Sequence, residues 1–330
     1  MDLDDEWASF LGDGPCIPTI VSPQEGPVPT ASPLYISTNT IISFLNQAID
    51  LAPIFWMIPI IPYTQPTVGV IKKQMKFNST QPEEVLDIQS RLTSCEYYVE
   101  HVISHMESKG NLKYKDVRKI TVGVSKKDIL SYRIRTKGAF YNCFALVIRL
   151  SIEPDRFREF HVKVFNTGKI EIPGVQDIHH VPIIIEYLLS IMRVYYPTLV
   201  YNTFMEETVL INSNFTCGFY VKRNELYHLL KSKYNISAVY DPCSYPGIQC
   251  KVYYHEGVTT IKQSISVSFM IFRTGSILIV GKCSVHVIHA IYDYLVELLK
   301  KEYTTIVESN VIICKKDTHP RKNKRFILIS

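Results

Sequence analysis

Histidines at helical spacing are the side chains of this sequence that come closest to a metal-ligating pattern. His101 and His105 stand four residues apart, but the glutamate that a zinc protease places between them is absent. His286, His289 and Asp293 could share one helix face, and a metal site would need further ligands that the sequence does not supply. The 8 cysteines form no Cys-x-x-Cys pair, and there is no glycine-rich phosphate loop. The sequence therefore predicts no metal site, no cofactor and no enzyme.

Two phenylalanines begin two copies of one short pattern. Phe165 begins Phe-Asn-Thr-Gly-Lys-Ile-Glu-Ile-Pro-Gly, and Phe272 begins Phe-Arg-Thr-Gly-Ser-Ile-Leu-Ile-Val-Gly. The Thr-Gly step is typical of a tight turn with one residue at positive φ, and the Ile-x-Ile alternation is typical of a strand with one buried face. Each copy therefore predicts a β-hairpin. Strand alternation places both phenylalanines on the face opposite to the buried isoleucines.

A segment with apolar residues at helical spacing follows each hairpin, over 179–196 and over 284–303. Matching residues recur in the two segments: Ile184 with Ile291, Tyr187 with Tyr294, and Leu188 with Leu295. Hairpin and helix therefore repeat together, and only two copies occur, which favours an internally duplicated domain over a solenoid. With 330 residues, 46% of them hydrophobic, the chain can bury the core of such a domain.

The second copy resembles a known family. The sequences Tyr-Asp-Pro-Cys-Ser-Tyr-Pro-Gly-Ile at 240–248, Ile-Phe-Arg-Thr-Gly-Ser at 271–276 and Val-Gly-Lys at 280–282 are similar to the second direct repeat of TATA-box-binding proteins (TBP). The wider sequence over 212–226 looks most like the divergent TBP-like proteins encoded by large nucleocytoplasmic DNA viruses. The resemblance implies an α+β fold: a TBP-like saddle of two pseudo-symmetric repeats, each a curved antiparallel sheet backed by helices.

In this family, pairs of phenylalanines on the concave sheet face wedge between base steps in the DNA minor groove and kink the duplex. The resemblance places Tyr245 and Phe272 at these positions in the second repeat, and Phe144 and Phe165 in the first. The position of Phe144 depends on an alignment without a gap, in which Phe140 is a rival. The alternative interpretation is that all four rings belong to an ordinary core.

Further residues complete the predicted DNA contact. The resemblance assigns groove and phosphate contacts to Arg149, Lys163, Lys169, Asn212, Lys251, Leu278 and Val280. Strand alternation also places Glu171 on the face of Phe165, where DNA phosphates would repel its carboxylate. Pro173 and Val280 replace two threonines that suit A·T base edges. These departures favour minor-groove binding over a strict preference for TATA sequences.

Charge is distributed unevenly along the chain, whose formal net charge is +5. No Lys or Arg precedes Lys72, while seven acidic residues do, so the body of the protein is basic and suits a polyanion partner. The leader at 1–37 is acidic and rich in Pro, Ser and Gly, which predicts disorder. The apolar segment 51–62 is too short to span a bilayer and contains three prolines, and we expect an extended arm.

The predicted organisation has four parts. They are an acidic, Pro-rich leader and apolar arm at 1–66, a first repeat at 67–200, a second repeat at 201–305 and a basic tail at 306–330. Apolar periodicity predicts a strand over 70–77 and helices over 40–50, 82–92 and 96–107. The region 96–119 is interpreted as a helical insertion, and 197–207 as the link between repeats.

The resemblance implies a transcription initiation factor that binds and bends promoter DNA through the minor groove and recruits RNA polymerase. Its expected partners are double-stranded promoter DNA, a IIB-type transcription factor and a multisubunit RNA polymerase, with no membrane and no small-molecule substrate. The expected location is the host nucleus, a cytoplasmic viral factory or the virion. The alternative is a structural adaptor that kept the TBP-like fold but binds protein partners. Glu171 and the lost threonines favour this alternative.

Overall fold

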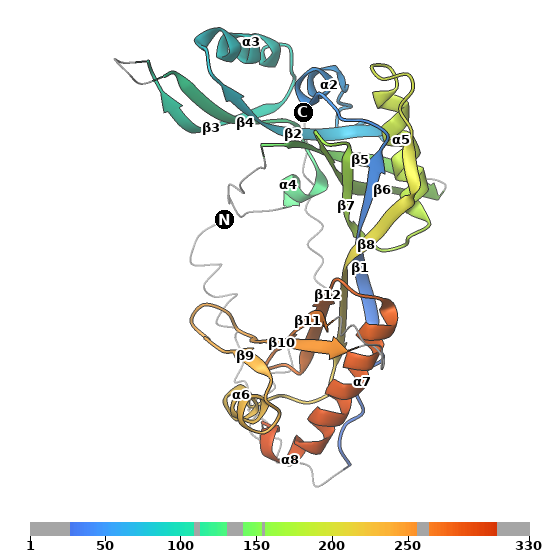
Figure 1. The fold of residues 1–330 in the computed structure, drawn as a ribbon, viewed down its shortest axis with the longest axis vertical. Coiled ribbons are helices and arrows are strands. Elements are labelled where there is room, and N and C mark those ends of the chain that lie inside the picture. The colour runs from blue at the N-terminus through green and yellow to red at the C-terminus, as the bar shows by residue number, and fades with distance from the viewer. Residues whose placement is uncertain (1–26, 109–112, 131–140, 154–155, 256–263, 309–330) are drawn as a thin grey trace, which may run out of the picture. The chain divides into compact units, whose positions relative to one another are not determined.

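The computed structural model describes residues 27–108, 113–130, 141–153, 156–255 and 264–308. The described chain forms two compact units (Figure 1). Unit 2 contains Ile36–Ser213 and Val280–Val285, and unit 1 contains Asn214–Ile279 with the segments that precede Ile36 and follow Val285. Most of the acidic leader, at 1–26, and the basic tail, at 309–330, lie outside the described residues.

Unit 2 is built on a sheet with the strand order β3-β4-β2-β5-β6-β7-β1-β8. The strands are β1 (Tyr35–Leu45), β2 (Gly69–Ser79), β3 (Tyr98–Met106), β4 (Lys115–Gly123), β5 (Cys143–Glu153), β6 (Arg156–Phe165), β7 (Lys169–Val175) and β8 (Tyr201–Thr216). The helices are α2 (Leu51–Met57), α3 (Pro82–Leu92), α4 (Lys126–Leu130) and α5 (His180–Met192). Strand pairs from β3 through to β7 and β1 are antiparallel.

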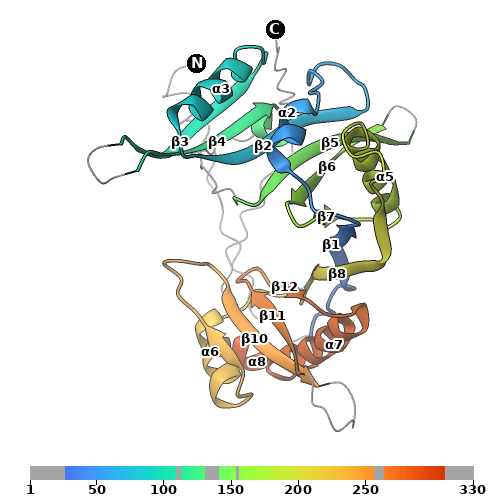
Figure 2. The same cartoon turned by 45° about the horizontal axis from the view of Figure 1, so that its top comes forward.

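Unit 1 has a smaller sheet with the order β12-β11-β10-β9. The strands are β9 (Ser237–Val239), β10 (Ile248–His255), β11 (Ser264–Ile271) and β12 (Ser276–Gly281), and the helices are α6 (Arg223–Ser232), α7 (Val285–Lys301) and α8 (Tyr303–Ile306). Helix α7 runs along this sheet (Figure 2). The apolar residues of this helix recur every three or four positions and therefore form one face, which includes Ile288, Ile291 and Leu295 and is buried.

The two hairpins predicted from the repeated pattern are confirmed. They are β6–β7 and β11–β12, and the glycine of each Thr-Gly step has a positive φ, +83° at Gly168 and +79° at Gly275. The isoleucines of both second strands are buried, as the alternation predicts. Helices α5 and α7 follow the hairpins within the predicted segments, and β2 and α3 lie where the sequence predicts them.

The same hydrogen bonds tie each hairpin to the segment beside it. In unit 2, Leu45 N donates to the carbonyl of Gly168 at 2.8 Å and Ile49 N to that of Asn166 at 2.9 Å. In unit 1, Cys217 N donates to the carbonyl of Gly275 at 2.9 Å and Val221 N to that of Arg273 at 2.8 Å. The end of β1 therefore binds the β6–β7 hairpin in the same way as the end of β8 binds the β11–β12 hairpin.

Three predicted elements are wrong. The segment 40–50 is not a helix, because its first half is strand β1, which pairs with β7. The segment 51–62 is not an extended arm: it begins with helix α2, whose Leu51, Ile54 and Phe55 are buried. The segment 96–107 contains strand β3 and is not a helix, so the region interpreted as a helical insertion forms a pair of strands, β3–β4. Residues 201–207, interpreted as a link, begin β8.

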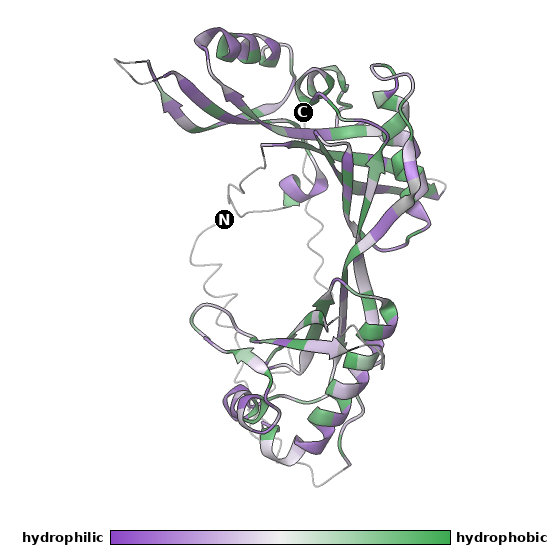
Figure 3. Ribbon diagram, viewed as in Figure 1, coloured by the Kyte–Doolittle hydropathy of each residue, from purple (hydrophilic) through white to green (hydrophobic). Residues whose placement is uncertain are grey.

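The apolar core of unit 2 lies between its sheet and its helices. Side chains of α2 and α5 pack with β1, β5, β6 and β7 in one cluster that includes Phe55, Phe144, Ile172 and Leu188. Figure 3 shows that α5 is largely hydrophobic, while α3 is more hydrophilic. The helix-covered face of the sheet is therefore the core of unit 2.

A buried lysine joins α2 to the sheet and makes stability depend on pH. Lys73 is 5% exposed. Its ammonium donates to the carbonyl of Ile58 at 2.6 Å and lies 5.0 Å from the centre of the Phe55 ring. Burial lowers the pKa of Lys73 from 10.5 to about 8. Because burial disfavours the charged ammonium, the folded protein releases the proton at a lower pH than the unfolded chain does.

We expect stability to rise with pH across this window. Between pH 8 and 10 the unfolded chain still binds the proton that the folded protein has lost, so Lys73 should add about 2 kcal/mol to the free energy of unfolding. Urea unfolding at pH 7, 8, 9 and 10 measures this rise relative to Lys73→Met, which lacks the titrating group. Lys251→Met, at an exposed position, is the control and should follow the wild type. A constant difference between wild type and Lys73→Met would contradict the prediction.

Candidate nucleic-acid interface

Strand alternation divides the sheet of unit 1 into a covered face and an open face. Ile248, Cys250, Phe269, Ile277 and Ile279 are buried on the helix side. The register pairs Gln249 with Met270, Lys251 with Ser268 and Tyr253 with Ser266 on the other side. Leu278 and Val280, which alternate with the buried isoleucines of β12, are half-buried there as well. The open face thus combines an apolar floor with the exposed cation Lys251.

An aromatic pair stands at one end of this open face. The rings of Tyr245 and Phe272 are 5.8 Å apart at an interplanar angle of 58°. The hydroxyl of Tyr245 lies 3.6 Å from the sulfur of Met270, and Arg223 donates to the carbonyl of Pro246 in the same loop. A β-carbon at Gly247 would lie 3.1 Å from ring carbons of both aromatic residues. The glycine therefore leaves space for the two rings to lie together.

The open face of unit 2 carries Phe165 and two of the predicted lysines. Lys169 Nζ lies 5.2 Å from the centre of the Phe165 ring. Lys163 is opposite Glu171 in the β6–β7 register, and their side chains form an ion pair of 2.6 Å. Glu171 thus lies on the predicted face, but its charge is compensated by a lysine of the same protein.

Two of the sequence-predicted site residues are elsewhere. Phe144 is fully buried in the core, because its register partner Val164 faces the helices. Arg149 is 7% exposed, and its guanidinium donates to the carbonyls of Tyr63, Gln65 and Thr67. Phe144 is therefore not a wedge and Arg149 is not available to a phosphate. The rival of Phe144, Phe140, lies outside the described residues.

Tyr141 holds the place that was assigned to Phe144. In unit 1 the register pairs Ile248 with Ile271, the residue before Phe272, and in unit 2 it pairs Phe144 with Val164, the residue before Phe165. Ile248 and Phe144 are therefore equivalent. Tyr245 and Tyr141 each lie three residues before these positions, so Tyr141 matches Tyr245. Tyr141 is 56% exposed. The sequence contains a signal for this match, because the spacing Tyr-x-x-apolar precedes both strands. An alignment without a gap hides the signal, because unit 1 has three more residues between Tyr245 and Phe272 than unit 2 has between Tyr141 and Phe165.

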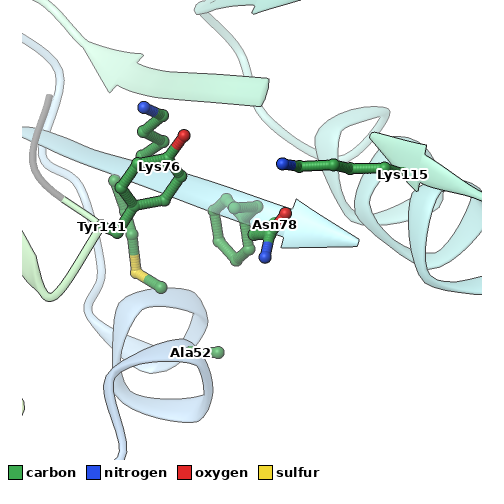
Figure 4. Close-up of a pocket in the computed structure, with 7 residues that line it drawn as sticks. Ala52, Lys76, Asn78, Lys115 and Tyr141 are labelled. Carbon is green, nitrogen blue, oxygen red and sulfur yellow. The ribbon is translucent and has the colours of Figure 1, made fainter. Parts of the chain in front are cut away.

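A cation lies on the Tyr141 ring. Lys76 Nζ is 3.4 Å from the ring centre, and its hydrogen bond to the hydroxyl lowers the pKa of Tyr141. Figure 4 shows Tyr141 beside Lys76, with Asn78 and Lys115 around the same hollow of about 640 Å³. An aromatic ring and two lysines at one exposed place suit a nucleic-acid backbone and the edge of its bases.

A lysine and a histidine lie further along the open face of unit 2. Lys72 and His161 are both opposite Val147, on its two sides. Partial desolvation lowers the pKa of His161, and the positive charges of Lys127 and Lys72 lower it further. Asp128 compensates part of this field through its 2.7 Å ion pair with Lys72. Because an imidazole with a lowered pKa is neutral near pH 7, the cations of this region that a polyanion could contact are its lysines.

Asn212 is held by the neighbouring strand β1. Its amide donates to the Thr38 hydroxyl at 3.0 Å, and the Ser37 hydroxyl donates to the Asn212 carbonyl at 3.0 Å. The sequence resemblance offers no counterpart of Asn212 in the first repeat. The structure supplies the Thr38 hydroxyl beside it, on strand β1, whose later residues fall in the helix that the sequence predicts over 40–50.

The described residues contain no group of three or more His, Cys, Asp and Glu side chains that could hold a metal ion. His105 lies in a strand, and its Nδ1 is 2.7 Å from Asp116. No described helix combines the length and the apolar character that crossing a bilayer requires.

Comparisons with known proteins give structural similarities but no sequence match. No family model matches the sequence, and no curated protein matches it. Among solved structures, the chain is similar to Methanococcus jannaschii TBP, with 13% sequence identity and a TM-score of 0.42, over 82% of this chain and 99% of that chain.

Proposed function

We propose that this protein is a TBP-like transcription initiation factor that binds duplex DNA in the minor groove and bends it. The observation that carries the proposal is the pair of aromatics at matching positions in both units, Tyr245 with Phe272 and Tyr141 with Phe165. Phe165 and Phe272 each follow a buried strand residue by one position, which places them on the open side. Tyr141 and Tyr245 lie three residues before matching strand residues, and none of the four rings is fully buried. Rings at such positions can insert between base steps and unstack them.

The fold proposed for this function is a saddle of two pseudo-symmetric repeats. The repeated hairpin sequence supports it, and so do the matching hydrogen bonds at Gly168 and Gly275. With β1 as the first strand of the first repeat, that repeat begins near Tyr35. Each repeat then has a first strand, a short helix, a sheet and a long final helix, namely α5 or α7.

Around DNA binding we propose the wider role that the sequence resemblance implies. The factor recruits a IIB-type transcription factor and a multisubunit RNA polymerase to promoter DNA of a large DNA virus, in the nucleus or in a viral factory. It acts by binding alone and catalyses no reaction. Because Pro173 and Val280 replace threonines at the groove floor, we propose that it binds A·T-rich sequences without requiring a TATA box.

The adaptor alternative depends on Glu171, whose carboxylate lies on the open face. A carboxylate there is unfavourable for DNA and would suit a cation of a protein partner. However, Lys163 of the same chain already pairs with it. The ion pair gives Glu171 a role that needs no protein partner, so we favour DNA binding.

The direct test is binding to a pool of random-sequence duplexes. The full chain should retard duplex DNA in an electrophoretic assay, and sequencing should show enrichment of A·T-rich minor grooves. Energy transfer between dyes at the two ends of a selected duplex should report a bend. No retardation at any salt concentration down to about 50 mM, where phosphate contacts are strongest, would overturn the proposal.

Removal of the Glu171 charge should strengthen DNA binding. Glu171→Gln keeps the size of the side chain and removes both the repulsion from phosphates and the ion pair that competes for Lys163. We expect affinity to rise about fivefold, which corresponds to roughly 1 kcal/mol. Glu186→Gln on α5 is the matched control, since Glu186 also pairs with a cation, Arg193, on the helix side. Equal affinities of Glu171→Gln and wild type would place Glu171 away from the DNA.

A further inference from the structure

Strand β3 is the edge of the sheet of unit 2. It begins the strand order and pairs with β4 from Tyr98 to Met106. Within the described residues no strand lies on its other side, so that side presents backbone N–H and C=O groups that a further strand can pair. The hairpin has no counterpart between β8 and β10 of unit 1, where only α6 and β9 occur.

This edge is unusually apolar for an exposed strand. Tyr98, Val99, Val102, Ile103 and Met106 are each between 41% and 48% exposed. Natural sheets protect such edges with lysine, proline or a covering element. Strand β3, with the sequence Tyr-Val-Glu-His-Val-Ile-Ser-His-Met, contains neither lysine nor proline. Its protective features are the charge of Glu100 and the irregularity of register between Val102 and Ser104.

The hairpin is held in shape by buried charges behind the edge. Arg118 on β4 donates to Asp116 at 2.6 Å and to Glu100 of β3 at 2.6 Å. Asp116 also lies 2.7 Å from Nδ1 of His105, and its side chain is fully buried. These bonds fix both ends of β3 on β4. The exposed edge is therefore ordered before any partner binds, which lowers the entropic cost of association.

We propose that β3 is a homodimer interface, in which the β3 strands of two copies pair edge to edge and antiparallel around a two-fold axis. The strand is complementary to itself in one register. Val102 is opposite Ile103 of the second copy, Glu100 is opposite His105, and Val99 is opposite Met106. Apolar residues thus meet apolar residues, and each carboxylate meets an imidazole.

In this register, residues that are opposite each other also lie on the same face of the sheet. In β3, Glu100 and His105 pair with Ile120 and Asp116, which belong to the same face of β4, while Val99 and Met106 pair with residues of the other face. The shift at Ile103 is what brings Glu100 and His105 onto one face. A register displaced by one residue would place Val99 opposite His105 and lose this agreement. Two-fold pairing also covers the β3 edge of both copies, so no β3 edge remains for a third copy and the assembly stops at two.

Sedimentation velocity of the full chain tests the proposal. Between roughly 1 and 100 μM, the range of weak specific interfaces, the wild type should shift from monomer to dimer. The variant Val102→Lys/Ile103→Lys puts four positive charges at the centre of the interface and should raise the dissociation constant at least about 100-fold. The control Leu86→Lys/Ile183→Lys makes the same chemical change at exposed apolar residues of α3 and α5 and should dimerise as the wild type does.

Cysteine pairing tests the register. In the proposed dimer, His101 of one chain is opposite Ser104 of the second chain. His101 is not opposite His101, and Ser104 is not opposite Ser104. On oxidation of a mixture of His101→Cys and Ser104→Cys, cross-linked species should contain one chain of each variant, identified by mass. Either variant alone should give no more cross-linking than the wild type with its native cysteines. A monomeric wild type at 100 μM, a dimer that survives Val102→Lys/Ile103→Lys, or growth beyond a dimer would each overturn the proposal.

Discussion

Alanine at both Phe165 and Phe272 is expected to abolish DNA bending while the protein stays folded. Each ring is half-buried on the open side of its strand, outside the helix-covered core. If the rings insert between base steps, their removal eliminates the force that unstacks those steps, and the duplex returns to its straight form. End-to-end energy transfer on a labelled duplex should fall to the value of free DNA, and affinity should fall by about tenfold or more.

Two controls separate wedging from general loss of aromatic surface. Tyr195→Ala removes an exposed ring that follows α5, and it should leave bending unchanged. Tyr141→Ala/Tyr245→Ala should reduce bending as the phenylalanine pair does, because the tyrosines are the second member of each aromatic pair. Bending that persists in a folded Phe165→Ala/Phe272→Ala protein would remove the aromatic assignment, and with it the main support for minor-groove binding.

Replacement of Gly275 by alanine is expected to destabilise unit 1 by about 3 kcal/mol or more. Gly275 has φ +79°, a conformation that costs a residue with a β-carbon about 1 kcal/mol. The β-carbon would also lie 2.1 Å from the carbonyl oxygen of Phe219, and this backbone atom cannot move without breaking the local structure. A loss of this size is a large part of the stability of an ordinary domain. Urea unfolding measures it.

Gly174 provides the matched control for this prediction. It has nearly the same φ, +80°, but nothing lies within 4 Å of the position that its β-carbon would take. Gly174→Ala should therefore cost only about 1 kcal/mol, the price of the backbone conformation alone. Equal losses in the two variants would show that the contact with Phe219 relaxes at no cost. A smaller loss for Gly275→Ala than for Gly174→Ala would contradict the prediction.

Elements whose pattern is local could be predicted from the sequence. The hairpins at Gly168 and Gly275 need only a turn glycine and an alternating strand, and α5 and α7 need only apolar residues at helical spacing. Strand β3 was wrongly predicted as a helix because an edge strand with exposed apolar residues on both faces has no alternation to recognise. Strand β1 was missed because its pairing with β7 joins residues that are far apart in the sequence.

The site shows the same division. The sequence by itself determined the repeated hairpins and the position of Phe165 and Phe272 on the face opposite to the buried isoleucines, because strand alternation has a period of two and depends on neighbouring residues alone. Only the tertiary structure decided that Phe144 is core and that Tyr141 is its exposed counterpart, since the pairing of β5 with β6 fixes which face each residue takes. A shift of one residue reverses every side chain, and no local pattern records the register of two distant strands.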